Sequence, residues 1–126
     1  MPHVALSIRG PWWWFMVHGA FRKDIENRSW STPFRGEVLI HASKGLTRAE
    51  YEDGCEFARE CGALEVPEFK DLLRGGIVGR CRIGDCVARS SSPWFVGPWG
   101  FVIEDAQSVP FMPCRGALGF FYPELP

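Results

Sequence analysis

The residues with the clearest chemical potential are one lysine, one glutamate and one arginine in a single short stretch: Lys23, Glu26 and Arg28. Alternate side chains of an extended strand share a face, so Glu26 and Arg28 point to one side and Lys23 can bend toward them. A carboxylate between two cations stays ionised and accepts hydrogen bonds from a base, whereas the two cations can bind an anion or a base edge. The same spacing also fits a surface salt-bridge ladder. The spacing alone therefore does not decide between a ligand-binding cluster and a set of surface ion pairs.

Tryptophan is the second feature of chemical interest, because six tryptophans and an aromatic share of 14% exceed what a small core needs. Trp12 is expected in the first turn of a helix beside the cluster, and Trp30 on the same strand face as the cluster. Trp94 and Trp99 lie in a loop rich in Gly and Pro that could fold over a cleft. Stacking on such rings stabilises a bound base by about 1–3 kcal/mol. Alternatively, Trp12 and Trp30 close the open end of a barrel.

Short strands and a few helices are expected to position these residues. A helix begins at Pro11 and runs to about His18, and a Thr47–Glu50 capping box begins a second helix that ends at Gly62. A third, short helix is predicted over 67–74, and a tight turn over 113–116. Alternating apolar residues predict strands over 4–9, 25–30, 37–43, 77–88, 101–104 and 118–121. The chain is therefore expected to be one mixed α/β (α+β) domain over 1–126, a small β-barrel of five to six strands with two or three helices at the strand connections.

Composition limits the function classes. The net charge of −1 argues against gripping long nucleic acid by its phosphates alone. The charge is uneven, however: residues 1–48 carry seven Lys/Arg and three Asp/Glu, and residues 49–126 carry seven and twelve. No apolar stretch is long enough to cross a membrane and no secretion signal is evident, so we expect a cytoplasmic protein.

Five cysteines without a CxxC pair are expected to be small buried hydrophobes, with no metal site and no cofactor. The run at 12–15 (Trp-Trp-Trp-Phe) is expected to leave one ring outside the core, as a patch for a protein partner or a homodimer.

Ten segments, spread over nearly the whole chain, form a pattern that is specific in order and spacing. They are ALSIR at 5–9, PW at 11–12, KDIENRSW at 23–30, RG at 35–36, IHASK at 40–44, GIVG at 76–79, DC at 85–86, SPWF at 92–95, GFV at 100–102 and CRGALG at 114–119. Together they resemble the ASCH-domain family. The resemblance implies a PUA-like β-barrel with a cleft beside the first helix. It also implies a role in RNA metabolism, in which members bind RNA or a modified nucleoside and sometimes hydrolyse it.

The hallmark of the family runs Gly-x-Lys-x-x-Glu-x-Arg, and Lys23, Glu26 and Arg28 match it in place. Two positions depart from the family pattern: Phe21 replaces the glycine, and Gly10 stands where a polar residue usually precedes the Pro-Trp pair. On this resemblance we expect the ligand to be RNA, a nucleoside or a nucleotide. The expected ligand-binding residues are Ser7, Arg9, Trp12, Lys23, Glu26, Arg28, Trp30, Lys44, Trp94, Trp99 and Arg115.

Two further functions stay open beside binding. Some members of the family resemble amidohydrolases of modified cytidine whose nucleophile is a threonine, and this chain has Glu26 at that position. Glu26 could act as a general base toward water or a ribose 2′-hydroxyl, with Lys23 as its catalytic partner, in an amidohydrolase or a ribonuclease. The second alternative is a protein-interaction module.

Overall fold

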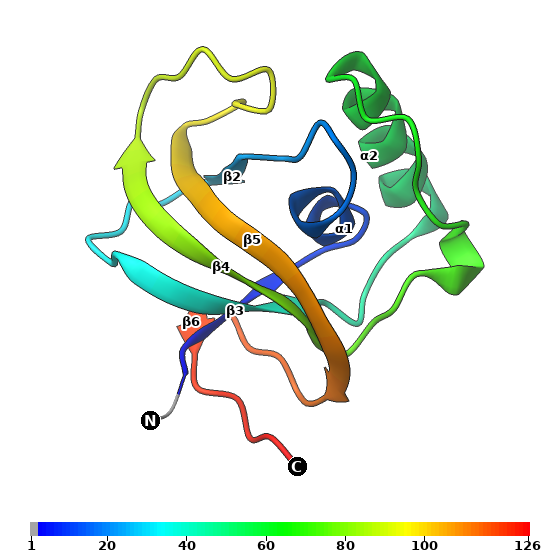
Figure 1. The fold of residues 1–126 in the computed structure, drawn as a ribbon, viewed down its shortest axis with the longest axis vertical. Coiled ribbons are helices and arrows are strands. Elements are labelled where there is room, and N and C mark those ends of the chain that lie inside the picture. Colours follow the sequence, from blue (N-terminus) through cyan, green and yellow to red (C-terminus); the bar gives the residue numbers. More distant parts are fainter. Residues whose placement is uncertain (1–2) are drawn as a thin grey trace.

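A six-stranded sheet that curls around one short helix is the framework of the computed structural model, which describes residues 3–126 (Figure 1). The strands follow the order β2-β5-β4-β3-β1-β6, in which only β1 and β3 run parallel. The mixed α+β fold is confirmed, and the curled half-barrel fits a small PUA-like barrel. The strands are β1 (Ala5–Ile8), β2 (Ile25–Arg28), β3 (Gly36–Ala42), β4 (Gly76–Val87), β5 (Trp99–Pro113) and β6 (Phe120–Phe121).

Both α-helices begin where local sequence signals predicted. Helix α1 (Trp12–Val17) begins directly after Pro11, and Gly19 beyond its end has a φ of 86°. Helix α2 (Arg48–Glu60) has a complete capping box, in which Thr47 accepts a hydrogen bond from the Glu50 amide and the Glu50 carboxylate accepts one from the Thr47 amide. Local hydrogen bonds of this kind satisfy helix ends without help from the rest of the fold.

The helix predicted over 67–74 is wrong in length, because only a single 3₁₀ turn, η1 (Phe69–Asp71), forms there. Leu72 leaves the turn with extended backbone angles and is buried. Its side chain packs in the same core cluster as Trp13. Burial of that one leucine against α1 therefore outweighs the helical preference of the segment.

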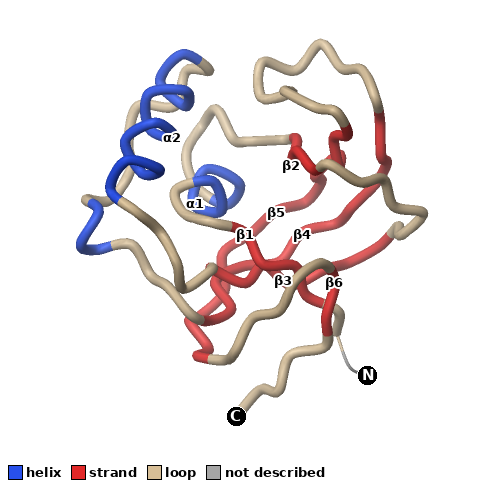
Figure 2. Tube along the Cα trace, turned by 180° about the vertical axis from the view of Figure 1, so that it is seen from behind, coloured by secondary structure: helices blue, strands red, loops and turns tan. Residues whose placement is uncertain are grey.

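The expected strand 101–104 is the start of a much longer one. β5 pairs along the full length of β4, with three register shifts that bend the ribbon. These shifts interrupt the alternation of apolar residues, which is why the pattern predicted only the first part of β5. The tight turn predicted over 113–116 is also wrong: the segment after β5 runs past β1 and β3 to reach β6, which pairs with β1 (Figure 2).

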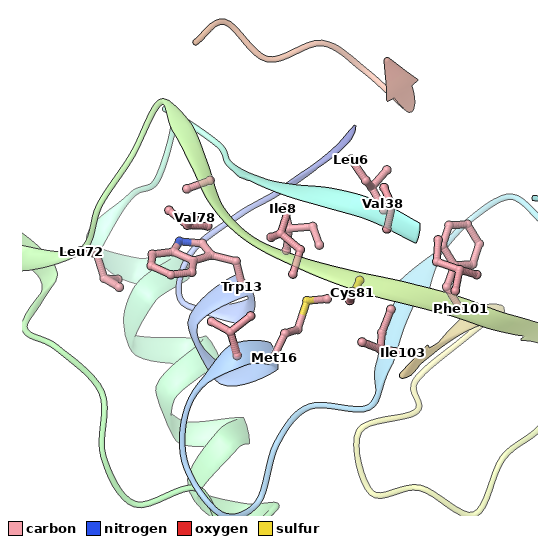
Figure 3. Close-up of a cluster of buried hydrophobic side chains, with 14 of the residues drawn as sticks. Leu6, Ile8, Trp13, Met16, Val38, Leu72, Val78, Cys81, Phe101 and Ile103 are labelled. Atoms are coloured by element: carbon pink, nitrogen blue, oxygen red, sulfur yellow. The ribbon is translucent and has the colours of Figure 1, made fainter. Parts of the chain in front are cut away.

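The main core lies between α1 and the concave face of the sheet (Figure 3). Trp13 and Met16 of α1 pack against Ile8 of β1 and Cys81 of β4. Burial raises the pKa of the Cys81 thiol to about 12, as expected of a cysteine that serves as a small hydrophobe. Cys55 is also buried, whereas the other three cysteines are half-buried.

The tryptophan run is only partly core. Trp13 and Phe15 are 3% and 2% exposed, whereas Trp12 and Trp14 are half-buried. Trp14 stacks on His18 with ring centroids 4.5 Å apart. Within residues 3–126, every helix is too short or too polar to cross a lipid bilayer.

Candidate functional site

Lys23, Glu26 and Arg28 form a continuous ionic chain at the sheet edge. The Lys23 amide donates to the carbonyl of Phe15, which ties the start of β2 to α1. Lys23 Nζ lies 3.6 Å from Glu26 Oε1, and Arg28 Nη2 lies 3.2 Å from Glu26 Oε2. Arg28 Nη2 also donates to the Ser7 carbonyl at 2.8 Å, so the guanidinium links β2 to β1.

Lys23 is unusual for a lysine because only 3% of it is exposed. Burial lowers the pKa of its ammonium below the ordinary value, and the neighbouring Glu26 carboxylate opposes that effect. Lys23 Nζ donates to the Ile25 carbonyl and lies 5.3 Å from the ring centroid of Trp12 and 5.8 Å from that of Trp94. The ammonium is thus held by a carboxylate, a carbonyl and two indole faces.

Two adjoining pockets open beside this chain and share a wall. The wall consists of Arg9, Trp12, Glu26 and Asn27, which line both pockets. The large pocket has a volume of about 1260 Å³ and the small pocket about 480 Å³. The small pocket has the size typical of sites for small organic ligands.

The small pocket combines polar groups with apolar walls. Lys23 and Glu26 supply its polar groups, and Trp12 and Phe57 meet edge-to-face with ring centroids 5.7 Å apart. Carboxylates from α2 stand at its other side, contributed by Glu50 and Asp53. Such a pocket can hold a flat, polar, uncharged group against a ring.

The large pocket is strongly basic. Five cations line it against one carboxylate, that of Glu26. Among the expected site residues, Ser7, Lys44 and Arg115 lie here beside Arg28, while Arg9 reaches both pockets. The five cations are Arg9, Arg28, Lys44, Arg74 and Arg115.

A serine–histidine pair forms part of the large pocket's lining. His41 Nε2 lies 2.9 Å from the Cys114 carbonyl, which can only accept, so Nε2 carries the proton. In the neutral ring Nδ1 is then an acceptor, and the Ser7 hydroxyl lies 3.1 Å from it, within reach to donate. The pair joins β1 and β3 to the segment after β5.

Three of the four candidate tryptophans lie away from the pockets. Trp94 is 2% exposed and packs against Phe15, so the loop at 88–98 contributes Val96 to the small pocket instead of an indole. Trp30 packs edge-to-face on Phe101, and Trp99 stands opposite Arg28 in the sheet. Trp12 is the tryptophan that lines the cleft.

Sequence reasoning missed Asn27 and Arg74 as lining residues. Strand alternation placed Asn27 on the face opposite Glu26, but β2 is an edge strand and both residues reach the pockets. The Asn27 amide donates to the Trp94 carbonyl and accepts from the Val96 amide. The asparagine thereby fixes the loop that borders the small pocket. The dense run of polar residues in β2 could have indicated Asn27 as a lining residue. Arg74 lies in a segment whose sequence gives no such indication.

Across residues 3–126, no three His, Cys, Asp or Glu side chains gather closely enough to hold an ion. The chemistry that the cleft offers is hydrogen bonding, charge pairing and stacking.

Comparison with known proteins agrees with the geometry. The search of curated proteins found no match. The family model described as ASCH domain matches residues 6–101, which include the three residues of the ionic chain, α1 and most of the residues that line the cleft. With three quarters of its length matched in this way, the chain belongs to the ASCH domain family.

Proposed function

We propose that the cleft binds RNA or a modified nucleoside, with a base in the small pocket. The observation that carries the proposal is the buried chain of Lys23, Glu26 and Arg28, which meets the pocket beside the Trp12 ring. Membership of the ASCH family, which is generally linked to RNA binding, supports the same function.

The hydrogen-bonding capacity of the ionic chain suits a base. Lys23 has three donors, one of which goes to the Ile25 carbonyl, while Glu26 Oε1 lies 3.6 Å from Nζ as its ion-pair partner. A further donor of Lys23 can reach a base carbonyl, while Glu26 Oε1 can accept from a ring imino or amino group. Trp12 supplies a face for stacking, which stabilises a base by about 1–3 kcal/mol. A base therefore satisfies both polar and apolar walls of the small pocket.

Binding can be tested directly by calorimetric titration with the four ribonucleosides, acetylated cytidine and short RNA oligomers. We expect at least one of these to bind more tightly than about 1 mM, a free energy of about −4 kcal/mol. Glu26→Gln should weaken that binding, because the amide cannot replace both carboxylate acceptors. Glu37→Gln, which changes an exposed ion pair on β3, is the matched control. Absence of binding, or equal affinity of the two variants, would refute the proposal.

Hydrolysis is a second candidate, favoured by the burial that lowers the Lys23 pKa next to a carboxylate. A lysine of lowered pKa gives up its proton more readily than an ordinary lysine, and Glu26 can accept a proton from water or from a ribose 2′-hydroxyl. The substrate would be a modified cytidine in an amidohydrolase, or RNA in a ribonuclease. Incubation with acylated cytidines and mixed RNA, followed by mass spectrometry, distinguishes an amidohydrolase from a ribonuclease. Turnover that disappears in Glu26→Gln supports hydrolysis, and intact substrates leave binding as the function.

A further inference from the structure

We propose that the large pocket holds a phosphate group of the ligand, so that the cleft prefers nucleotides to nucleosides. The proposal rests on the proposed function, because a base in the small pocket sets where its phosphate falls. The shared wall of Arg9, Trp12, Glu26 and Asn27 lets one ligand occupy both pockets.

The two pockets differ sharply in charge. The large pocket sets five cations against the single carboxylate of Glu26. The small pocket sets Arg9 and Lys23 against the three carboxylates of Glu26, Glu50 and Asp53. A ligand with an uncharged base and an anionic phosphate is therefore oriented by the field alone, phosphate toward the large pocket.

Three of the five cations are already engaged with protein groups. Arg9 Nη1 reaches both carboxylate oxygens of Glu50, at 2.8 and 2.9 Å. Arg28 binds Glu26 and the Ser7 carbonyl. Arg74 Nη1 donates to the Leu46 carbonyl at 3.2 Å.

The remaining two cations, Lys44 and Arg115, are available to bind an anion. Lys44 and Arg115 are exposed, and neither forms an ion pair with any part of residues 3–126. They come from different elements, since Lys44 follows β3 and Arg115 follows β5. A phosphate between them would gain charge-assisted hydrogen bonds, including a two-pronged one from the guanidinium.

Arg115 is positioned by its neighbours. The preceding carbonyl, that of Cys114, accepts the His41 Nε2 hydrogen bond. The following residue, Gly116, packs so closely on the His41 ring that a Cβ there would come within 2.6 Å of it. The backbone on both sides of Arg115 is thus fixed against β1 and β3, which keeps its side chain at the pocket.

A phosphate monoester on a mononucleotide and a phosphodiester in RNA present the same chemistry to this site. The ligands for the test are therefore the four ribonucleosides, their 5′-monophosphates, dinucleoside monophosphates with one internal phosphodiester, and inorganic phosphate. Each is titrated by calorimetry against the wild type and two variants. Lys44→Ala/Arg115→Ala removes the proposed phosphate ligands, and Lys70→Ala/Arg89→Ala removes the same charge from exposed positions outside both pockets.

We expect the wild type to bind a 5′-monophosphate about tenfold or more tightly than its nucleoside, the factor that one good charge-assisted contact supplies. The Lys44→Ala/Arg115→Ala variant should lose this preference and keep the nucleoside Kd, whereas the control variant keeps both. If a dinucleoside monophosphate also binds more tightly than the nucleoside, the site accepts the phosphodiester linkage of RNA. If it does not, the site accepts a terminal phosphate.

Two results would overturn the proposal: equal affinity of the wild type for nucleoside and monophosphate, or a preference that survives in Lys44→Ala/Arg115→Ala. Failure of the base site gives a different pattern. In that case nucleosides do not bind, yet inorganic phosphate still binds in a manner that depends on Lys44 and Arg115, which retains the phosphate site alone. If neither nucleosides nor phosphate bind, both proposals are refuted.

Discussion

Arg28 binds a single oxygen of Glu26 with two of its nitrogens, because Nε and Nη2 each lie 3.2 Å from Oε2. Oε1 lies 3.6 Å from Lys23 Nζ. The arginine therefore fixes the orientation of the carboxylate, and the lysine pairs with its other oxygen.

Glu26→Gln should destabilise the fold markedly. The variant leaves the buried Lys23 ammonium without its counter-ion, and loss of one partner of a buried ion pair costs about 3–5 kcal/mol. Urea denaturation should report a fall of that order in the free energy of unfolding. Glu37→Gln, in the exposed pair with Arg80, should leave the unfolding curve almost unchanged. Equal effects of the two substitutions would mean that the pair is not effectively buried.

The burial of Lys23 predicts a distinctive pH dependence. Its folded-state pKa lies below the ordinary value of 10.5, so between the two values the unfolded chain binds more protons than the folded one. Stability contributed through Lys23 must then rise with pH in that interval. We expect the free energy of unfolding of the wild type, minus that of Lys23→Met, to be flat at low pH and to increase toward pH 10.5. A difference that stays constant or falls would show that the pKa of Lys23 is not lowered.

Trp12 should matter for binding and Trp99 should not. Trp12→Leu removes the ring shared by both pockets, so nucleoside affinity should fall about tenfold, within the 1–3 kcal/mol of a stacked base. Trp99→Leu removes an indole on β5 outside the lining and serves as the control. The comparison is made by titration of both variants with the same nucleoside. A greater loss in Trp99→Leu would place the stacking surface elsewhere.

Gly116→Ala should disturb the large pocket without disturbing the small one. The new Cβ would come within 2.6 Å of His41 Cε1 and 2.7 Å of Ser7 Oγ, so the segment after β5 must shift. Overpacking of this kind costs about 1–3 kcal/mol. Nucleotide affinity should fall several-fold while nucleoside affinity holds. At Gly45 the nearest atom to a new Cβ is 4.0 Å away, so Gly45→Ala should alter neither affinity. Identical behaviour of the two alanine variants would contradict this view of the pocket wall.

Much of the fold could be predicted from local signals in the sequence. The capping box at Thr47, the proline before α1 and the alternation in β1, β2 and β3 were visible in the sequence, because each depends on neighbours a few residues away. The full extent of β5 and the route of the segment after it were not. They depend on register shifts against β4 and on the contacts of Cys114 and Gly116 with His41, which join residues more than seventy positions apart.

The candidate site could likewise be predicted only where it depends on residues close together in the sequence. The ionic chain was predictable because Lys23, Glu26 and Arg28 come from one strand and its entrance. The position of Trp94 was not, because an aromatic residue in a Gly/Pro loop can cover a cleft or fill the core with equal local propensity. Here the Asn27 amide holds its loop against β2, and the ring packs against Phe15 and Phe57 in the core.

Nuclear magnetic resonance of the labelled chain, during titration with nucleoside 5′-monophosphates, can locate a base bound at the ionic chain. We expect the Trp12 indole N–H and the Glu26 and Asn27 amides to shift first and most strongly. The 115–119 amides should shift only when the ligand carries its phosphate. Shifts confined to surfaces remote from the two pockets, or no shifts at millimolar ligand, would show that a base does not bind at the ionic chain.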